Sequence, residues 1–133
     1  MVRSASPEGE RLSRHHRLRR RADFLRCYRR GGKRRGSLAT LHYHPNEQRE
    51  VRLGITASRK VGKAVLRHRV KRRVREIFRR FPGRRDLPAL DVVVHLWPTA
   101  GRADFSTLRN ELERLLSSLR HRELRRPRSG RRR

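Results

Sequence analysis

Apolar side chains recur along this chain with two different periods, and the changes of period divide it into expected helices and strands. Between residues 63 and 81 they fall at helical spacing and cover roughly a third of a helical wheel. A shorter segment, residues 20–30, places Phe24 and Tyr28 four positions apart and ends at a glycine pair. A third helix is expected to begin at residues 104–106 and carries leucines at the same spacing.

Strands are expected between these helices, where apolar and polar positions alternate. Residues 38–44 and 51–58 show this alternation, and the short polar connection between them favours an antiparallel pair. Residues 91–97 form a third strand, which ends at Pro98. One sheet face is apolar and should lie under the two later helices, whereas the polar face has no helix obviously assigned to it. The order α-β-β-α-β-α is typical of an α+β fold.

The helix expected at residues 63–81 carries a dense cationic face opposite its apolar stripe. Solvated helices usually mix acidic and basic side chains at neighbouring positions, but here like charges repeat and Glu76 alone interrupts them. An ordinary solvated face is the alternative interpretation. Because a polyanion would supply the missing negative charge, the pattern indicates nucleic-acid binding by this helix.

The net charge of the whole chain also favours a polyanionic partner. Its 133 residues suggest one small domain, and 39 Lys and Arg against 12 Asp and Glu give a formal net charge of +27. Such a balance favours capture of phosphate. A membrane surface would attract the same charge, but the sequence has neither an apolar run of about 18 residues nor a signal peptide. We therefore expect a cytoplasmic protein that does not bind membranes.

The two ends of the chain differ from its middle. Residues 1–17 and 121–133 are rich in arginine and lack periodicity, so both are expected to be basic disordered extensions. Residues 18–120 remain as the folded domain, which is small but long enough to bury a core.

Side chains suited to catalysis are scarce. Cys27 is the single cysteine and lies among apolar neighbours, which favours a small core residue over a nucleophile. His15 with His16, and His42 with His44, are close in sequence, but no CxxC or HExxH motif accompanies them. We therefore expect no catalytic residue and no metal site in the protein.

The segment from Ser58 to Glu76, SRKVGKAVLRHRVKRRVRE, closely resembles the signature of the bacterial ribonuclease P protein component. The family pattern there is roughly S-K-K-x-G-x-A-V-x-R-N-R-x-K-R-x-x-R-E. The helix DFLRCYRRG, the strand that begins at Asp91 and the leucine-rich helix after Phe105 match the family as well, in the same order. The resemblance covers about residues 18–120.

This resemblance implies a fold and a function. The fold is a small α/β sandwich with a four-stranded, mostly antiparallel sheet, a left-handed βαβ crossover and the order α-β-β-β-α-β-α, so residues 33–35 would be the extra strand. The function is that of the protein subunit of an RNA-based endonuclease. It binds a large catalytic RNA and the 5′ leader of precursor tRNA, while the RNA removes the leader with Mg²⁺ that it mainly holds itself. The alternatives are a non-enzymatic basic RNA-binding protein, such as a ribosomal protein, and a protein-only nuclease, which lacks a visible active site.

The resemblance also assigns the cationic helix face to the catalytic RNA. The family's usual asparagine is replaced by His68, which cannot supply the paired donor and acceptor of an amide. The residues expected to contact the catalytic RNA are Arg67, His68, Arg69, Lys71, Arg72, Arg73 and Arg75.

A second set of side chains is assigned to the leader. Phe24 and Tyr28 match family positions that line the leader-binding cleft, although helical spacing alone would favour two core rings. His42 is either a leader contact or an inert surface histidine, and Trp97 is expected to be structural. The expected leader contacts are Phe24, Tyr28, His42, Arg59 and Lys60.

Overall fold

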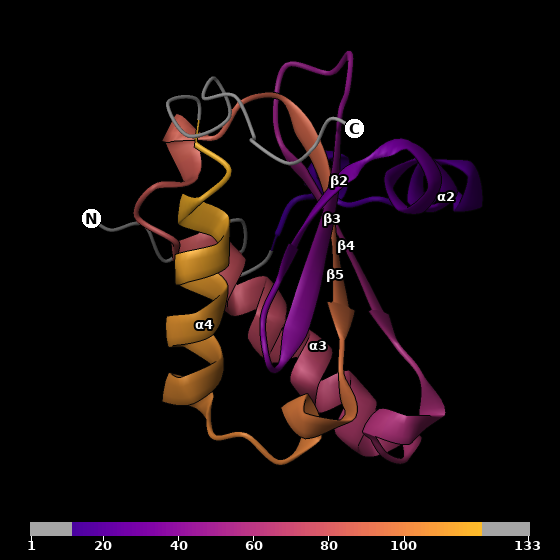
Figure 1. Ribbon diagram of the computed structural model, residues 1–133, viewed down its shortest axis with the longest axis vertical. Helices are drawn as coiled ribbons and strands as arrows, with labels where there is room; N and C mark the ends of the chain where they lie inside the picture. Colours follow the sequence, from indigo (N-terminus) through magenta and orange to yellow (C-terminus); the bar gives the residue numbers. More distant parts are fainter. Residues whose placement is uncertain (1–11, 121–133) are drawn as a thin grey trace, which may run out of the picture.

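The computed structural model describes residues 12–120, in which three helices surround a four-stranded sheet (Figure 1). The helices are α2 (Arg21–Arg30), α3 (Ala64–Arg80) and α4 (Phe105–Ser117). The strands are β2 (Gly32–Arg35), β3 (Ala39–Pro45), β4 (Arg52–Ala57) and β5 (Leu90–Leu96). Short 3₁₀ turns are η1 (Arg14–His16), η2 (Arg59–Val61), η3 (Arg84–Asp86) and η4 (Pro98–Gly101).

The sheet has the strand order β2-β3-β5-β4. β2 pairs antiparallel with β3 and β3 antiparallel with β5, whereas β4 and β5 are parallel and joined through α3. The predicted α+β class and the order α-β-β-β-α-β-α are confirmed, including the extra strand before β3.

The expected pairing of the strands at 38–44 and 51–58 is wrong, because β5 lies between β3 and β4. The two strands do run in opposite directions, but they are next-nearest neighbours. Neighbouring strands are about 4.8 Å apart, so a connection of a few residues easily spans the extra strand. Asn46 and Arg52, at the two ends of that connection, both donate hydrogen bonds to Asp91 at the start of β5. A short connection therefore does not guarantee a hairpin.

The main core lies between the sheet and the two later helices, as predicted (Figure 1). Helix α3 buries Val70, Val74, Ile77 and Phe78, which all belong to its apolar stripe. Helix α4 adds a row of leucines at the same period, beginning with Leu108. Each large apolar side chain that becomes buried contributes about 1.5–3 kcal/mol to the free energy of folding. This burial is therefore the main force that packs both helices on the sheet.

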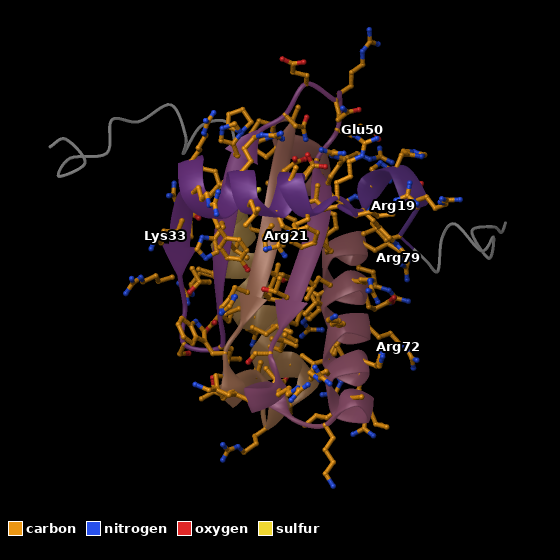
Figure 2. The ribbon with its side chains drawn as sticks, turned by 90° about the vertical axis from the view of Figure 1, so that its right-hand side faces the viewer. Arg19, Arg21, Lys33, Glu50, Arg72 and Arg79 are labelled. Carbon is orange, nitrogen blue, oxygen red and sulfur yellow. The ribbon has the colours of Figure 1, made fainter. Side chains whose placement is uncertain are left out.

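The opposite sheet face is partly covered, contrary to the expectation that no helix covers it. Helix α2 lies across one end of this face and leaves the remainder without a helix (Figure 2). Its fully buried Cys27 packs with Leu18 and Val93 in a second, smaller core. Burial, with the carboxylates of Asp91 and Asp23, raises the pKa of the Cys27 thiol to about 12. Cys27 is thus a core residue, as predicted.

Charged side chains also hold α2 on the sheet. Asp23 on α2 accepts a hydrogen bond from Arg26 at 3.0 Å and forms an ion pair of 3.6 Å with Arg52 on β4. Arg52 in turn donates two hydrogen bonds of 2.8 and 2.9 Å to the buried carboxylate of Asp91. Next to this network the ring of Phe24 packs against Gly54, where an added Cβ would lie 2.7 Å from the ring. The position of Phe24 therefore depends on that glycine.

The folded domain begins earlier than the expected boundary at residue 18. Leu12 is buried in the main core, and Arg17 forms a parallel bridge with Leu53 on β4. Residues 12–17 are therefore a structured part of the domain, because they supply an apolar side chain and a backbone pairing. The rest of the two expected extensions, residues 1–11 and 121–133, lies outside the described residues.

Candidate nucleic-acid interface

Helix α3 presents a basic face that points away from the sheet, and Figure 2 shows Arg72 and Arg79 on its outer side. Glu76 pairs with Arg79 at 2.7 Å and also with Arg80, so one carboxylate is shared by two arginines and offsets one of their two positive charges. Burial alone would raise the pKa of Glu76, but Arg79 and Arg80 outweigh it and hold the pKa below its usual range. Arg79 and Arg80 were not among the predicted RNA contacts. Within residues 12–120, none of the predicted contacts forms an ion pair with a carboxylate; these are Arg67, His68, Arg69, Lys71, Arg72, Arg73 and Arg75.

The first turns of α3 bring three of the predicted RNA contacts together. Arg67, His68 and Lys71 line a small cavity of about 130 Å³, with Ala64 as its fourth wall. The Nε atom of Arg67 is buried and has no hydrogen-bond partner in the described part of the chain. A cavity with two cations, an exposed imidazole and an orphaned donor is suited to an anionic oxygen.

The basic face extends beyond α3 to the N-terminal segment. Burial, with the positive charges of Arg17 and Arg72, lowers the pKa of Arg75 below its ordinary value. Like charges are therefore crowded at this point, and a polyanion would relieve the repulsion. Sequence reasoning missed Arg17 because it assigned residues 1–17 to a disordered extension.

A larger arginine-rich cavity adjoins the start of α2. Its volume is about 460 Å³, and it is lined by side chains from η1, the segment between η1 and α2, α2 itself, the β3–β4 connection and β4. Because these segments are far apart in sequence, no local pattern predicted the cavity. Its lining residues are Arg14, His15, Arg17, Arg19, Arg20, Asp23, Gln48 and Arg52.

A row of aromatic and imidazole rings begins on α2 and continues over the sheet face that this helix partly covers. The rings of Tyr28 and His42 are 4.5 Å apart, and His95 on β5 lies 6.0 Å from Tyr28. The hydroxyl of Tyr28 is 2.7 Å from Oγ1 of Thr56 and 3.1 Å from Nδ1 of His95, which ties α2 to β4 and β5. Flat rings on an open sheet face are the usual means of stacking unpaired bases.

The structure brings three of the five predicted leader contacts, Phe24, Tyr28 and His42, to this face, and places the other two together at the end of β4. Phe24 and Tyr28 are half-buried, so each ring both packs on the sheet and keeps an accessible part. Burial, with Lys33 and His95 nearby, lowers the pKa of His42 to about 4, so its ring is neutral at pH 7. The other two, Arg59 and Lys60, lie in the exposed turn η2 after β4.

His95 was not among the predicted site residues, although its spacing in the sequence places it on the same strand face as Val93. Val93 and His95 are two positions apart in β5, and Trp97 follows the strand at the same spacing, so the three side chains are expected on one face. The missing information was the position of β5 in the sheet, since the register places His95 between Thr40 and Thr56.

One group of possible metal ligands occurs in residues 12–120, formed by His15, His16 and Glu50. Glu50 already forms a hydrogen bond with the ring of His16, and Arg14 and Arg17 flank the two histidines in sequence. Mg²⁺ prefers oxygen ligands, so this nitrogen-rich group in a cationic neighbourhood does not fit it. Across the same residues, no helix combines the length and the apolar character that a membrane span requires.

These features define the class of the protein: a small, strongly basic α+β sandwich with one unneutralised arginine face and one ring-lined sheet face. The sequence profile described as Ribonuclease P matches residues 12–120, and the chain belongs to this family. The family comprises protein components of a ribonucleoprotein nuclease that processes tRNA.

Individual relatives agree with this assignment. The ribonuclease P protein component of Brucella suis is 37% identical over 111 residues, covering 77% of this chain and 78% of the relative. That of Coxiella burnetii is 39% identical over 104 residues, covering 77% and 84%. Among solved structures, the RNase P protein of Thermotoga maritima superposes with a TM-score of 0.67 at 39% identity, covering 75% of this chain and 94% of that one. A Staphylococcus aureus RNase P protein gives 0.70 at 32% identity, with 77% and 93% covered.

Proposed function

We propose that this chain is the protein subunit of ribonuclease P and that it contacts two RNA partners through two surfaces. Helix α3 binds the catalytic RNA, and the open sheet face binds the 5′ leader of precursor tRNA. The observation that carries the proposal is the chemical difference between these surfaces. One presents unneutralised guanidinium groups on a rigid helix, and the other presents rings on a mildly polar sheet.

The surface on α3 suits a folded RNA. Guanidinium groups along a helix can lie against consecutive phosphates without reading bases, and each phosphate contact adds to the salt dependence of binding. The cavity at Arg67, His68 and Lys71 offers a place for one phosphate group at the start of this surface. Arg17 and Arg75 extend the same charge toward the N-terminal segment.

The open sheet face suits a single strand. Stacking on rings contributes on the order of 1–3 kcal/mol per base and accepts any sequence, which fits leaders of varied sequence. His42 is neutral, so it contributes a ring face and hydrogen bonds but no charge. Arg59 and Lys60 lie in the turn after β4, where their charges meet the phosphates of the strand.

In this proposal the protein binds and orients RNA, and the catalytic RNA carries out hydrolysis with Mg²⁺ that it holds itself. The product is mature tRNA with a processed 5′ end. A cytoplasmic location is part of the same proposal. No side chain is assigned a role in bond cleavage, since the described histidines and carboxylates form no oxygen-rich metal group.

Reconstitution tests the proposal directly. We expect the full-length protein to cleave no RNA by itself and to increase cleavage of precursor tRNA when added to its ribonuclease P RNA at low Mg²⁺. Equal rates with and without protein would remove the proposal. Sequencing the RNA that copurifies with the protein tests the alternative, because ribosomal RNA alone would favour a ribosomal protein.

Two variants separate the two surfaces. Arg69→Ala should weaken assembly with the catalytic RNA and reduce the salt slope of binding by about 0.7–0.9. Phe24→Ala should leave assembly unchanged and reduce the preference for precursor over mature tRNA. Arg109→Ala, on the exposed side of α4, is the control for loss of one positive charge. If Arg109→Ala weakened assembly as much as Arg69→Ala, the binding would be nonspecific attraction by net charge.

A further inference from the structure

Trp97 is an exposed aromatic side chain at the end of the ring-lined sheet face. It directly follows β5, and 42% of it is accessible to solvent. Within residues 12–120, the other large apolar side chains with comparable exposure are Val65 and Phe105, which belong to α3 and α4. An exposed indole leaves a large apolar surface in water, so a partner for it would be favourable.

The orientation of the indole is fixed by its neighbours. Its Nε1 donates a hydrogen bond of 3.0 Å to Oγ1 of Thr40 on β3. Its ring lies 5.5 Å from the ring of His95, at an angle of 80°. His95 is in turn 6.0 Å from Tyr28 and 6.3 Å from His42. The rings therefore form a continuous row from α2 to the end of β5, and Trp97 is its last member.

The turn that carries the cations Arg59 and Lys60 lies at the same end of the sheet. β4 and β5 are parallel, and Ala57 is paired with Leu96, so the residues that follow both strands emerge side by side. The turns η2 and η4, which come next in the chain, are in contact. A single strand that follows the row of rings would therefore have positive charge within reach where it meets Trp97.

We propose that Trp97 stacks on an unpaired base of single-stranded RNA and so extends the leader-binding surface beyond Tyr28 and His42. This inference rests on the proposed function and deepens it, because it names a further contact residue in the same site. It also replaces the expectation that Trp97 is structural. Trp97 keeps much of its surface exposed beside the rings of the proposed site, so its indole is available to a base.

The chain offers a direct spectroscopic probe, because Trp97 is its single tryptophan. We expect a short oligoadenylate to quench the fluorescence of the full-length protein in a saturable manner, since a stacked base quenches indole emission. Quenching should persist in Phe105→Ala, which removes another exposed ring, from helix α4. Saturable binding of the oligonucleotide with no change in emission would overturn the inference.

Affinity measurements with the reconstituted holoenzyme complete the test. Trp97→Ala should weaken binding of precursor tRNA by about 5-fold or more, as expected for one lost stack, and leave mature tRNA within about twofold. Trp97→Phe should restore most of the affinity, which distinguishes loss of the ring from disturbance of the fold. An equal loss for precursor and mature tRNA, or no loss in Trp97→Ala, would overturn the inference.

Phe24→Ala, measured beside these variants, separates this inference from the proposed function. If Phe24→Ala reduces the preference for precursor and Trp97→Ala does not, the leader surface stands and Trp97 is not part of it. If neither variant changes that preference, the proposal that this sheet face binds the leader is wrong, and the inference about Trp97 is wrong as well.

Discussion

Glu111 on α4 holds the β2–β3 connection, and its replacement by alanine should be strongly destabilising. One carboxylate oxygen accepts hydrogen bonds from the backbone and hydroxyl of Ser37 at 3.1 and 2.8 Å. The other accepts from the backbone N–H groups of Leu38 at 2.7 Å and Ala39 at 3.1 Å. The side chain thus satisfies three consecutive N–H groups at the start of β3.

The size of the effect follows from what the substitution leaves behind. Leu38 and Ala39 are buried, so their N–H groups would lose their partner where water has little access. A buried unsatisfied donor costs about 1–3 kcal/mol, and two of them give about 2–6 kcal/mol. Ser37 is exposed and can bond to water, so it adds little. We expect the free energy of unfolding to fall by about 4 kcal/mol.

Urea denaturation followed by circular dichroism measures this change. Glu113→Ala is the matched control, because Glu113 lies on the same helix and forms no ion pair in the described part of the chain. Surface substitutions of this kind usually change stability by less than about 0.5 kcal/mol. A loss below about 1 kcal/mol for Glu111→Ala, or one equal to that of the control, would refute the reasoning.

The same carboxylate should make stability depend on pH. Burial alone would raise the pKa of Glu111, but the hydrogen bonds from Leu38, Ser37 and Ala39 outweigh it and hold the pKa below its usual range. The folded state therefore binds this proton less readily than the unfolded state. The stabilisation is complete above the unfolded pKa of about 4.3 and is lost as the pH falls through the folded pKa. Glu111→Gln should lose less stability than the wild type between pH 5 and pH 3.

Three further outcomes are expected. Gly54→Ala should displace the Phe24 ring, destabilise the fold by about 1–3 kcal/mol in urea denaturation and weaken leader preference, although Gly54 is not itself a proposed RNA contact. Arg52→Ala should cost about 3–5 kcal/mol in the same assay, because it leaves the buried Asp91 carboxylate without its bidentate partner. The Cys27 thiol, with a pKa of about 12, should resist iodoacetamide at pH 8 until the protein is unfolded, as followed by mass spectrometry; rapid labelling of the native protein would contradict its burial.

The helices were predictable because their signals are local. The apolar stripe of α3 repeats every three or four residues, and the structure buries Val70, Val74, Ile77 and Phe78 as that stripe requires. The same spacing predicted α4, and the glycine pair predicted the end of α2 at Arg30. Each of these signals lies within one segment, so no knowledge of the remaining chain was needed.

The strand order was not predictable in this way. Alternation identified β3, β4 and β5, but it does not say which strands are neighbours. The pairing of β5 between β3 and β4 depends on the crossover through α3 and on Asp91, which holds Asn46 and Arg52 together. These contacts join residues that are far apart in sequence.

The two surfaces of the candidate site also differ in how far they could be predicted from the sequence. The amino-acid sequence alone determined the basic face of α3, because the charge and the apolar stripe of one helix follow from a single stretch of residues. The family resemblance assigned Tyr28 and His42 to one cleft, but the tertiary structure alone placed their rings in a row with His95 and Trp97, since these residues come from α2, β3 and the end of β5. The physical reason is that helical periodicity is set by neighbours along the chain, whereas a sheet face is assembled by strands that meet only after folding.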